Sequence, residues 1–230
     1  MMLGIQLLLV VLGFWMQHGS DSSSGPQNSV VPNLSSAATR RIWPFYLCII
    51  ALEWGLVATV RGAMNRCGFR LADLINGASF PNWKNLLRDV LISVPFFFVW
   101  QYTGHFVSQL LGPNRAKSIE GLLPQEHSAL EAVLWIMVSI SAGICEEIVF
   151  RGYFQHNFAV YTRSIAAAVV LQGLVFGLGH AYQGAKQVII ICILGMVYGW
   201  FAAWRKNLRS NIMTHAWTDI WNGWLSRLIG

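Results

Sequence analysis

The sequence has little charge. Aspartate, glutamate, lysine and arginine make up 11% of its 230 residues, whereas an average soluble domain has about 25%. Hydrophobic residues make up 55%. So little charge cannot cover the surface of a soluble globular protein, and the composition indicates an integral, multi-pass membrane protein.

Cysteine is also scarce, with four residues and no C-x-x-C pair. Cys48, Cys145 and Cys192 lie in apolar stretches, where cysteine acts as a small hydrophobic residue. This pattern excludes a disulfide framework and a cysteine-based zinc finger. The net charge of +6 gives no evidence for nucleic acid as a partner, so the expected surroundings are membrane lipids.

Long apolar runs are abundant, and a helix needs roughly 20 such residues to cross a bilayer. Residues 90–111, 164–181 and 187–204 contain no Asp, Glu, Lys or Arg, and residues 42–60 contain only Glu53. Residues 132–150 and 211–225 are apolar except for Glu146, Glu147 and Asp219. We therefore predict an all-α, polytopic membrane bundle with about seven spans.

The chain divides into three parts by composition. Residues 1–18 are a first span or an uncleaved signal anchor, because they lack a basic start and a clear cleavage site; a cleaved signal peptide is the alternative. Residues 19–39 are rich in Ser, Gly and Pro and indicate a flexible loop. Residues 40–230 form one membrane domain, in which two Gly-x-x-x-Gly pairs, starting at Gly173 and Gly195, favour close helix packing.

The first unusual pair of charges is Glu146 and Glu147. A charged side chain in a bilayer core costs about 2.5–3.5 kcal/mol, so such groups usually face a protein interior or a wet cavity. Arg151 lies four residues after Glu147 and is expected to pair with it. Glu146 then has no neutralising partner nearby and is our candidate general base. The alternative is a Glu-Glu-Arg anchor in headgroup water.

The last apolar segment has two faces. Polar residues recur at i, i+4 and i+7, and tryptophans repeat with the same spacing on the opposite side: His215, Asp219 and Asn222 against Trp217, Trp221 and Trp224. This pattern favours a reactive edge that faces inward, although a polar stripe can also serve helix packing alone. Similarly, His180 ends a charge-free segment four residues after Phe176, and a lone buried histidine is often only hydrogen bonded.

Three motifs follow one another on apolar segments: Glu146-Glu147-x-x-x-Arg151, Phe176-x-x-x-His180 and His215-x-x-x-Asp219. In this order they resemble the CAAX protease and bacteriocin-processing family of intramembrane peptidases. The resemblance covers residues 132–225, and three ordered motifs are far more specific than any one of them. Nothing similar is found in the first 130 residues.

The resemblance implies an all-helical membrane peptidase with a cavity open to one side, which hydrolyses a peptide bond near the membrane surface. Glu146 and His180 would activate the attacking water, and His215 and Asp219 would support the oxyanion or the substrate carbonyl. Four further residues would support these groups: Glu147, Arg151, Phe176 and Asn222. The substrate would be a protein or peptide that can carry a lipid, such as a prenylated CAAX tail, or else a bacteriocin leader.

The sequence leaves open whether a metal takes part. One glutamate and two histidines with an open fourth position are the ligands of hydrolytic zinc sites, so Glu146, His180 and His215 could hold one divalent ion. We favour catalysis without a cofactor. The third motif can end in Asn or Asp, and an ionised Asp219 cannot donate to an oxyanion. It could instead orient His215, stay protonated or bind a metal.

The sequence leaves open both the positions of Glu146 and His180 across the membrane and the class of function. If helices begin near residues 132 and 164 and residues 151–163 are a loop, Glu146 and His180 lie toward opposite membrane faces; a helix that continues past Arg151 removes this mismatch. The polar residues could also line the path of a transporter or channel. A catalytically inactive immunity or scaffold protein of the same fold is the third possibility.

Overall fold

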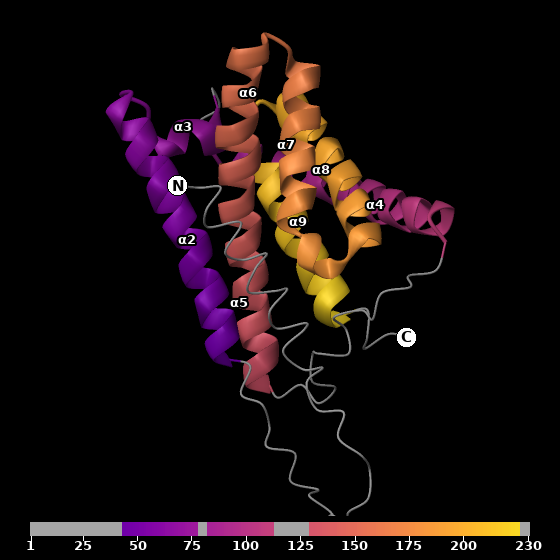
Figure 1. Ribbon diagram of the computed structural model, residues 1–230. Helices are drawn as coiled ribbons and strands as arrows, with labels where there is room; N and C mark the ends of the chain where they lie inside the picture. Colours follow the sequence, from indigo (N-terminus) through magenta and orange to yellow (C-terminus); the bar gives the residue numbers. More distant parts are fainter. Residues whose placement is uncertain (1–42, 78–81, 113–128, 226–230) are drawn as a thin grey trace, which may run out of the picture.

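The computed structural model describes residues 43–77, 82–112 and 129–225 (Figure 1). The predicted first span at 1–18 and the predicted loop at 19–39 lie outside these residues. The described part is helical and contains no strand, so the predicted all-α class is confirmed.

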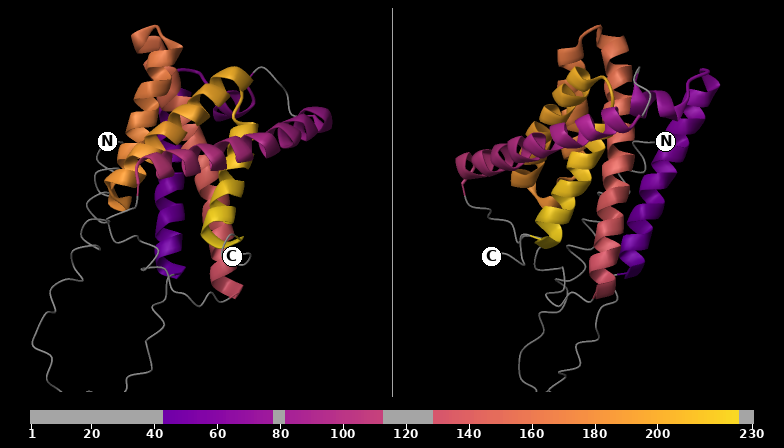
Figure 2. Two further views of the ribbon diagram at one scale, coloured as in Figure 1. Left: turned by 90° about the vertical axis from the view of Figure 1, so that its right-hand side faces the viewer. Right: turned by 180° about the vertical axis from the view of Figure 1, so that it is seen from behind.

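The elements are, in chain order, α2 (Trp43–Arg66), α3 (Leu71–Asn76), α4 (Trp83–Leu110), α5 (Ala129–Glu146), the π-helix η2 (Glu147–Phe154), α6 (Gln155–Thr162), α7 (Ile165–Gly179), the 3₁₀-helix η3 (Ala181–Gln183), α8 (Ala185–Arg205), α9 (Arg209–Ile220) and the π-helix η4 (Trp221–Leu225). α5, η2 and α6 follow one another as a single long rod (Figure 1). α2 packs along one side of α5, and α9 packs along another. α4 crosses α8 and α9 at a steep angle (Figure 2).

Four of these helices are long and apolar enough to cross a membrane: Tyr46–Arg66, Trp83–Leu110, Ala132–Thr162 and Ala185–Arg205. α7 is apolar but shorter. The expected span at 211–225 corresponds to α9 and η4, which are not among the four. Large apolar side chains of α4 face outward, since Leu91, Tyr102 and Phe106 are each more than 60% exposed. Such a surface is suited to lipid.

The predicted loop at residues 151–163 is wrong, because the chain stays helical through η2 and α6. Arg151 suggested a polar connection, but it is buried and paired with Glu147. The turn comes only at Arg163, whose φ is 55°, and the Ser164 hydroxyl then caps α7 by accepting from the Ala167 N–H at 3.2 Å. The continuous rod removes the expected mismatch between Glu146 and His180.

Small residues allow α7 and α8 to approach closely, as the glycine spacing predicted. A Cβ on Gly173 would lie 3.0 Å from the Cys192 carbonyl oxygen, and one on Gly195 would lie 3.0 Å from the Gly173 Cα. Two buried amides also bond across this region, from Gln172 to the Gly195 carbonyl at 2.7 Å and from Gln155 to the Gly199 carbonyl at 3.0 Å.

A buried ion cluster joins α4 to the turn between α8 and α9. Asp89 has no exposed surface. Its carboxylate accepts from Arg205 at 2.6 Å and from Arg209 at 2.5 Å. The Ser210 hydroxyl donates to the Asp89 carbonyl at 3.2 Å. One carboxylate thus compensates two arginines and fixes the start of α9, the helix that carries the third motif.

We expect Asp89→Asn to lower the free energy of unfolding by about 3–5 kcal/mol, because it leaves two guanidinium groups without their counter-charge. Thermal or denaturant unfolding of the purified protein in detergent measures this. Arg88→Gln, at the exposed neighbouring position, is the control and should change the unfolding midpoint little. Equal midpoints for Asp89→Asn and the wild type would contradict a stabilising role for the cluster.

Candidate active site

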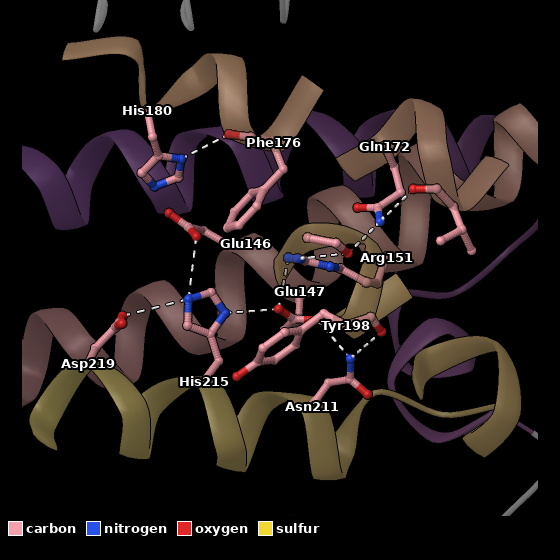
Figure 3. Close-up of polar contacts among 12 residues, drawn as sticks. Glu146, Glu147, Arg151, Gln172, Phe176, His180, Tyr198, Asn211, His215 and Asp219 are labelled. Atoms are coloured by element: carbon pink, nitrogen blue, oxygen red, sulfur yellow. Dashed lines mark hydrogen bonds and ion pairs between the residues drawn. The ribbon is translucent and has the colours of Figure 1, made fainter. Parts of the chain in front are cut away.

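Glu147 is the centre of a buried polar network (Figure 3). It has no exposed surface and receives three donors. Arg151 Nη1 lies 2.9 Å and His215 Nδ1 2.8 Å from its Oε1, and Asn211 Nδ2 lies 3.2 Å from its Oε2. The expected Glu147–Arg151 pair is therefore present. The same carboxylate also links the first motif to the third, between η2 and α9.

Arg151 is held between two aromatic rings. The centre of its guanidinium group lies 4.3 Å from the Phe176 ring centroid and 5.1 Å from the Tyr198 ring centroid. A guanidinium group over aromatic faces is attracted by their π electrons, and more strongly where water is excluded. These contacts give Phe176 a physical role in the second motif, because it fixes the cation that neutralises Glu147.

His215 is surrounded by carboxylates on both sides of its ring. Its Nδ1 faces Glu147, and its Nε2 lies 3.6 Å from Glu146 Oε2 and 3.6 Å from Asp219 Oδ2. A ring nitrogen that faces an ionised carboxylate must donate, so this surrounding suits an imidazole that carries a proton on each nitrogen. Such a ring directs an N–H into the space between Glu146 and Asp219.

His180 completes the group from the end of α7. Its Nδ1 lies 2.9 Å from the carbonyl oxygen of Phe176. Because a carbonyl only accepts, this nitrogen is the donor, so in the uncharged tautomer Nε2 is an acceptor. Figure 3 shows the Glu146 carboxyl between the rings of His180 and His215. An acceptor nitrogen, a carboxylate and an N–H thus border one space.

The exposed fraction of the side chain differs between the residues that border this space and those behind them. The Glu146 side chain is 22% exposed and that of Asp219 is 32%, whereas those of Glu147 and Arg151 are at 0%. Glu146 and Asp219 are therefore accessible from outside the protein, whereas the pair behind them is not. Glu146 and Asp219 are thus accessible to a bound molecule, whereas Glu147 and Arg151 only hold neighbouring side chains in place.

A family model described as type II CAAX prenyl endopeptidase Rce1-like matches residues 128–221, which contain all three motifs. Residues 128–221 form an Rce1-like domain. Rce1-like proteins are membrane proteases, and the family resemblance of the sequence is thereby confirmed. The comparisons with curated proteins and with solved structures gave no match.

Several contacts fasten α5 to α9 within the Rce1-like domain. The indole N–H of Trp135 donates to the Asp219 carbonyl at 3.0 Å. A Cβ on Gly143 would lie 2.9 Å from the Ala216 backbone nitrogen, so the two helices approach closely. The predicted two-sided character of α9 is also visible, because His215 is 9% exposed and Trp217 is 51% exposed. Trp224 lies at a position whose side chain is not described.

Asn222 lies in η4, just after the matched residues, and its side chain accepts a hydrogen bond from Gln101 of α4 at 3.0 Å. Three residues in or beside the network were not among the predicted site residues. Asn211 lies four residues before His215, and that spacing could have revealed it. Tyr198 gave no signal beyond a polar group in an apolar run. Glu53, the single charge of its segment, was visible, but its partners were not.

The described residues do not present a metal site. Among them, no group of three or more His, Cys, Asp or Glu side chains is arranged to hold an ion. His215 uses one ring nitrogen on Glu147, and the other is 3.6 Å from each of two carboxylate oxygens. Among the described residues, Glu146, His180 and His215 are thus not grouped so as to hold an ion, and the proposed mechanism uses none.

Proposed function

We propose that this chain is a multi-pass intramembrane endopeptidase, in which Glu146 and His180 activate water and His215 and Asp219 support the reacting carbonyl. The observation that carries the proposal is the contact of His215 with both Glu146 and Glu147, because it joins the first and third motifs around one space. The Rce1-like match supports hydrolysis of a peptide bond.

The first step is attack by water on the scissile carbonyl. A water molecule between Glu146 and His180 gives its proton to the Glu146 carboxylate while its oxygen bonds to the carbonyl carbon. His180 Nε2 orients the water as an acceptor. The carbonyl oxygen becomes an oxyanion, and the N–H at His215 Nε2 donates to it.

The second step breaks the carbon–nitrogen bond. The protonated Glu146 gives its proton to the leaving nitrogen while the oxyanion re-forms the carbonyl and the carbon–nitrogen bond breaks. The resulting carboxylic acid passes its remaining proton to the amine, so the products are a carboxylate and an ammonium group. Asp219 lies 3.6 Å from His215 Nε2 and acts by orienting that ring, since an ionised carboxylate has no proton to donate. Glu147, with Arg151 behind it, holds the opposite ring nitrogen.

We further propose a prenylated CAAX-type peptide as the substrate, from the description of the matching family. The test is a panel of peptides offered to the purified protein in liposomes: a farnesylated CAAX peptide, the same peptide without lipid, a bacteriocin leader and an unrelated membrane-protein loop. Mass spectrometry identifies the cleaved bond.

The wild type should cleave the farnesylated peptide fastest, and His180→Ala should be slower by at least about 100-fold, because it removes the water-orienting acceptor. Cleavage of the leader instead would change the substrate assignment. If the wild type cleaves no peptide of the panel, a transporter, or an inactive immunity or scaffold protein, would explain these buried polar groups better.

A further inference from the structure

Glu53 of α2 lies outside the Rce1-like match and has no part in the three motifs. It is the only Asp, Glu, Lys or Arg among residues 42–60. It occupies the stripe of α2 that turns toward α5, at the spacing of the buried side chains on that stripe: Tyr46, Val57, Val60 and Met64. A carboxyl group on this inward stripe needs a partner, because burial without one is costly.

The partner is Ser141 on α5. Its hydroxyl donates to Glu53 Oε2 at 2.6 Å, and the Ser141 residue is only 6% exposed. Glu53 is also close enough to Glu146, Asp219 and His215 to interact with them electrostatically. α2 therefore brings a carboxyl group to the border of the site.

The position of Ser141 gives this bond a consequence for Glu146. α5 ends at Glu146, and η2 begins at Glu147 with π-helical hydrogen bonding. The last regular turns of α5, from Ser141 to Glu146, are thus followed by a change of helix type, which often occurs at functional sites. A bond from a neighbouring helix to the start of this stretch restrains where Glu146 lies.

We propose that Glu53 is a positioning residue of the hydrolytic site, which holds through Ser141 the end of α5 that bears Glu146. This inference rests on the proposed function. A small misplacement of a catalytic group can cost up to about 100-fold in rate. Glu53→Leu and Ser141→Ala should each lower kcat by about 10-fold or more, with KM unchanged.

Two further variants make the test specific. Glu53→Gln keeps an oxygen that accepts from Ser141 and should retain most of kcat. The double variant Glu53→Leu with Ser141→Ala should be no slower than either single variant, because both remove the same bond. Thr59→Val is the matched control on α2, since the Thr59 hydroxyl bonds to Gly55 of its own helix and its loss should leave kcat unchanged.

Unfolding midpoints in detergent accompany each kinetic measurement, and Ser141→Ala provides the test if Glu53→Leu does not fold. Wild-type kcat in both single variants would overturn the inference, as would a change confined to KM, additive losses in the double variant, or a Glu53→Gln variant as slow as Glu53→Leu. In each of these results the wild type still cleaves its substrate. A wild type without peptidase activity would refute the proposed function and this inference together.

Discussion

Glu146→Gln should lower kcat for peptide cleavage by about 10²–10⁴-fold, which is the usual contribution of a general base. The glutamine amide has the shape of the glutamate carboxylate and still lies beside His215, but it cannot take a proton from water. Because Glu146 is partly exposed and pairs with no arginine in the part of the chain that the structure describes, its replacement should leave the unfolding midpoint close to that of the wild type. Steady-state cleavage and unfolding, measured on the same sample, check both expectations.

His156→Gln is the matched control for this change, since His156 lies on the same rod at an exposed position of α6. It should leave kcat unchanged. Near-normal cleavage by a folded Glu146→Gln variant would sink the assignment of Glu146 as the base.

Unlike Glu146→Gln, Glu147→Gln should lower the free energy of unfolding, by about 3–5 kcal/mol, because it leaves a buried guanidinium group without its counter-charge. Arg151 is fully buried and has Glu147 as its ion-pair partner at 2.9 Å. The substitution also weakens the bond to His215 Nδ1, so activity falls along with stability. Unfolding in detergent or by denaturant measures the loss.

A second variant separates the charge from the packing. In Glu147→Gln with Arg151→Met, the buried cation is removed together with its partner, and the long methionine side chain remains between the rings of Phe176 and Tyr198. The double variant should therefore be more stable than Glu147→Gln alone, as for other buried pairs replaced as a unit. If Glu147→Gln unfolds at the wild-type midpoint, the pair does not stabilise the fold.

Much of this arrangement could be expected from sequence, because the signals were local. Glu147 and Arg151 are four residues apart on one helix, and glycines at four-residue spacing allow two helices to pack closely. His215 and Asp219 share a face for the same reason. Each of these inferences requires only the helical period.

The wrong prediction and the contacts that were not predicted have one physical cause, which is that they depend on side chains from distant parts of the chain. The pair of Arg151 with Glu147 was expected, but the rings of Phe176 and Tyr198 that bury the guanidinium group were not, and a charge at residue 151 was therefore taken as the start of a loop. Likewise, no sequence period connects Glu53 with Ser141, which are 88 positions apart. The π-helix after Glu146 leaves no simple pattern either, since its hydrogen bonds depend on what packs around it.

The fastening of α5 to α9 limits how a substrate can enter. Trp135 bonds to the Asp219 carbonyl, Gly143 lies against Ala216, and a Cβ on Gly223 would overlap the Trp135 ring at 2.2 Å. Because α9 and η4 contact α5 at three levels, they cannot separate from it without losing all three contacts, and these contacts hold Glu146 and Asp219 at a fixed separation. A substrate that reaches both side chains therefore has to approach them without parting these helices.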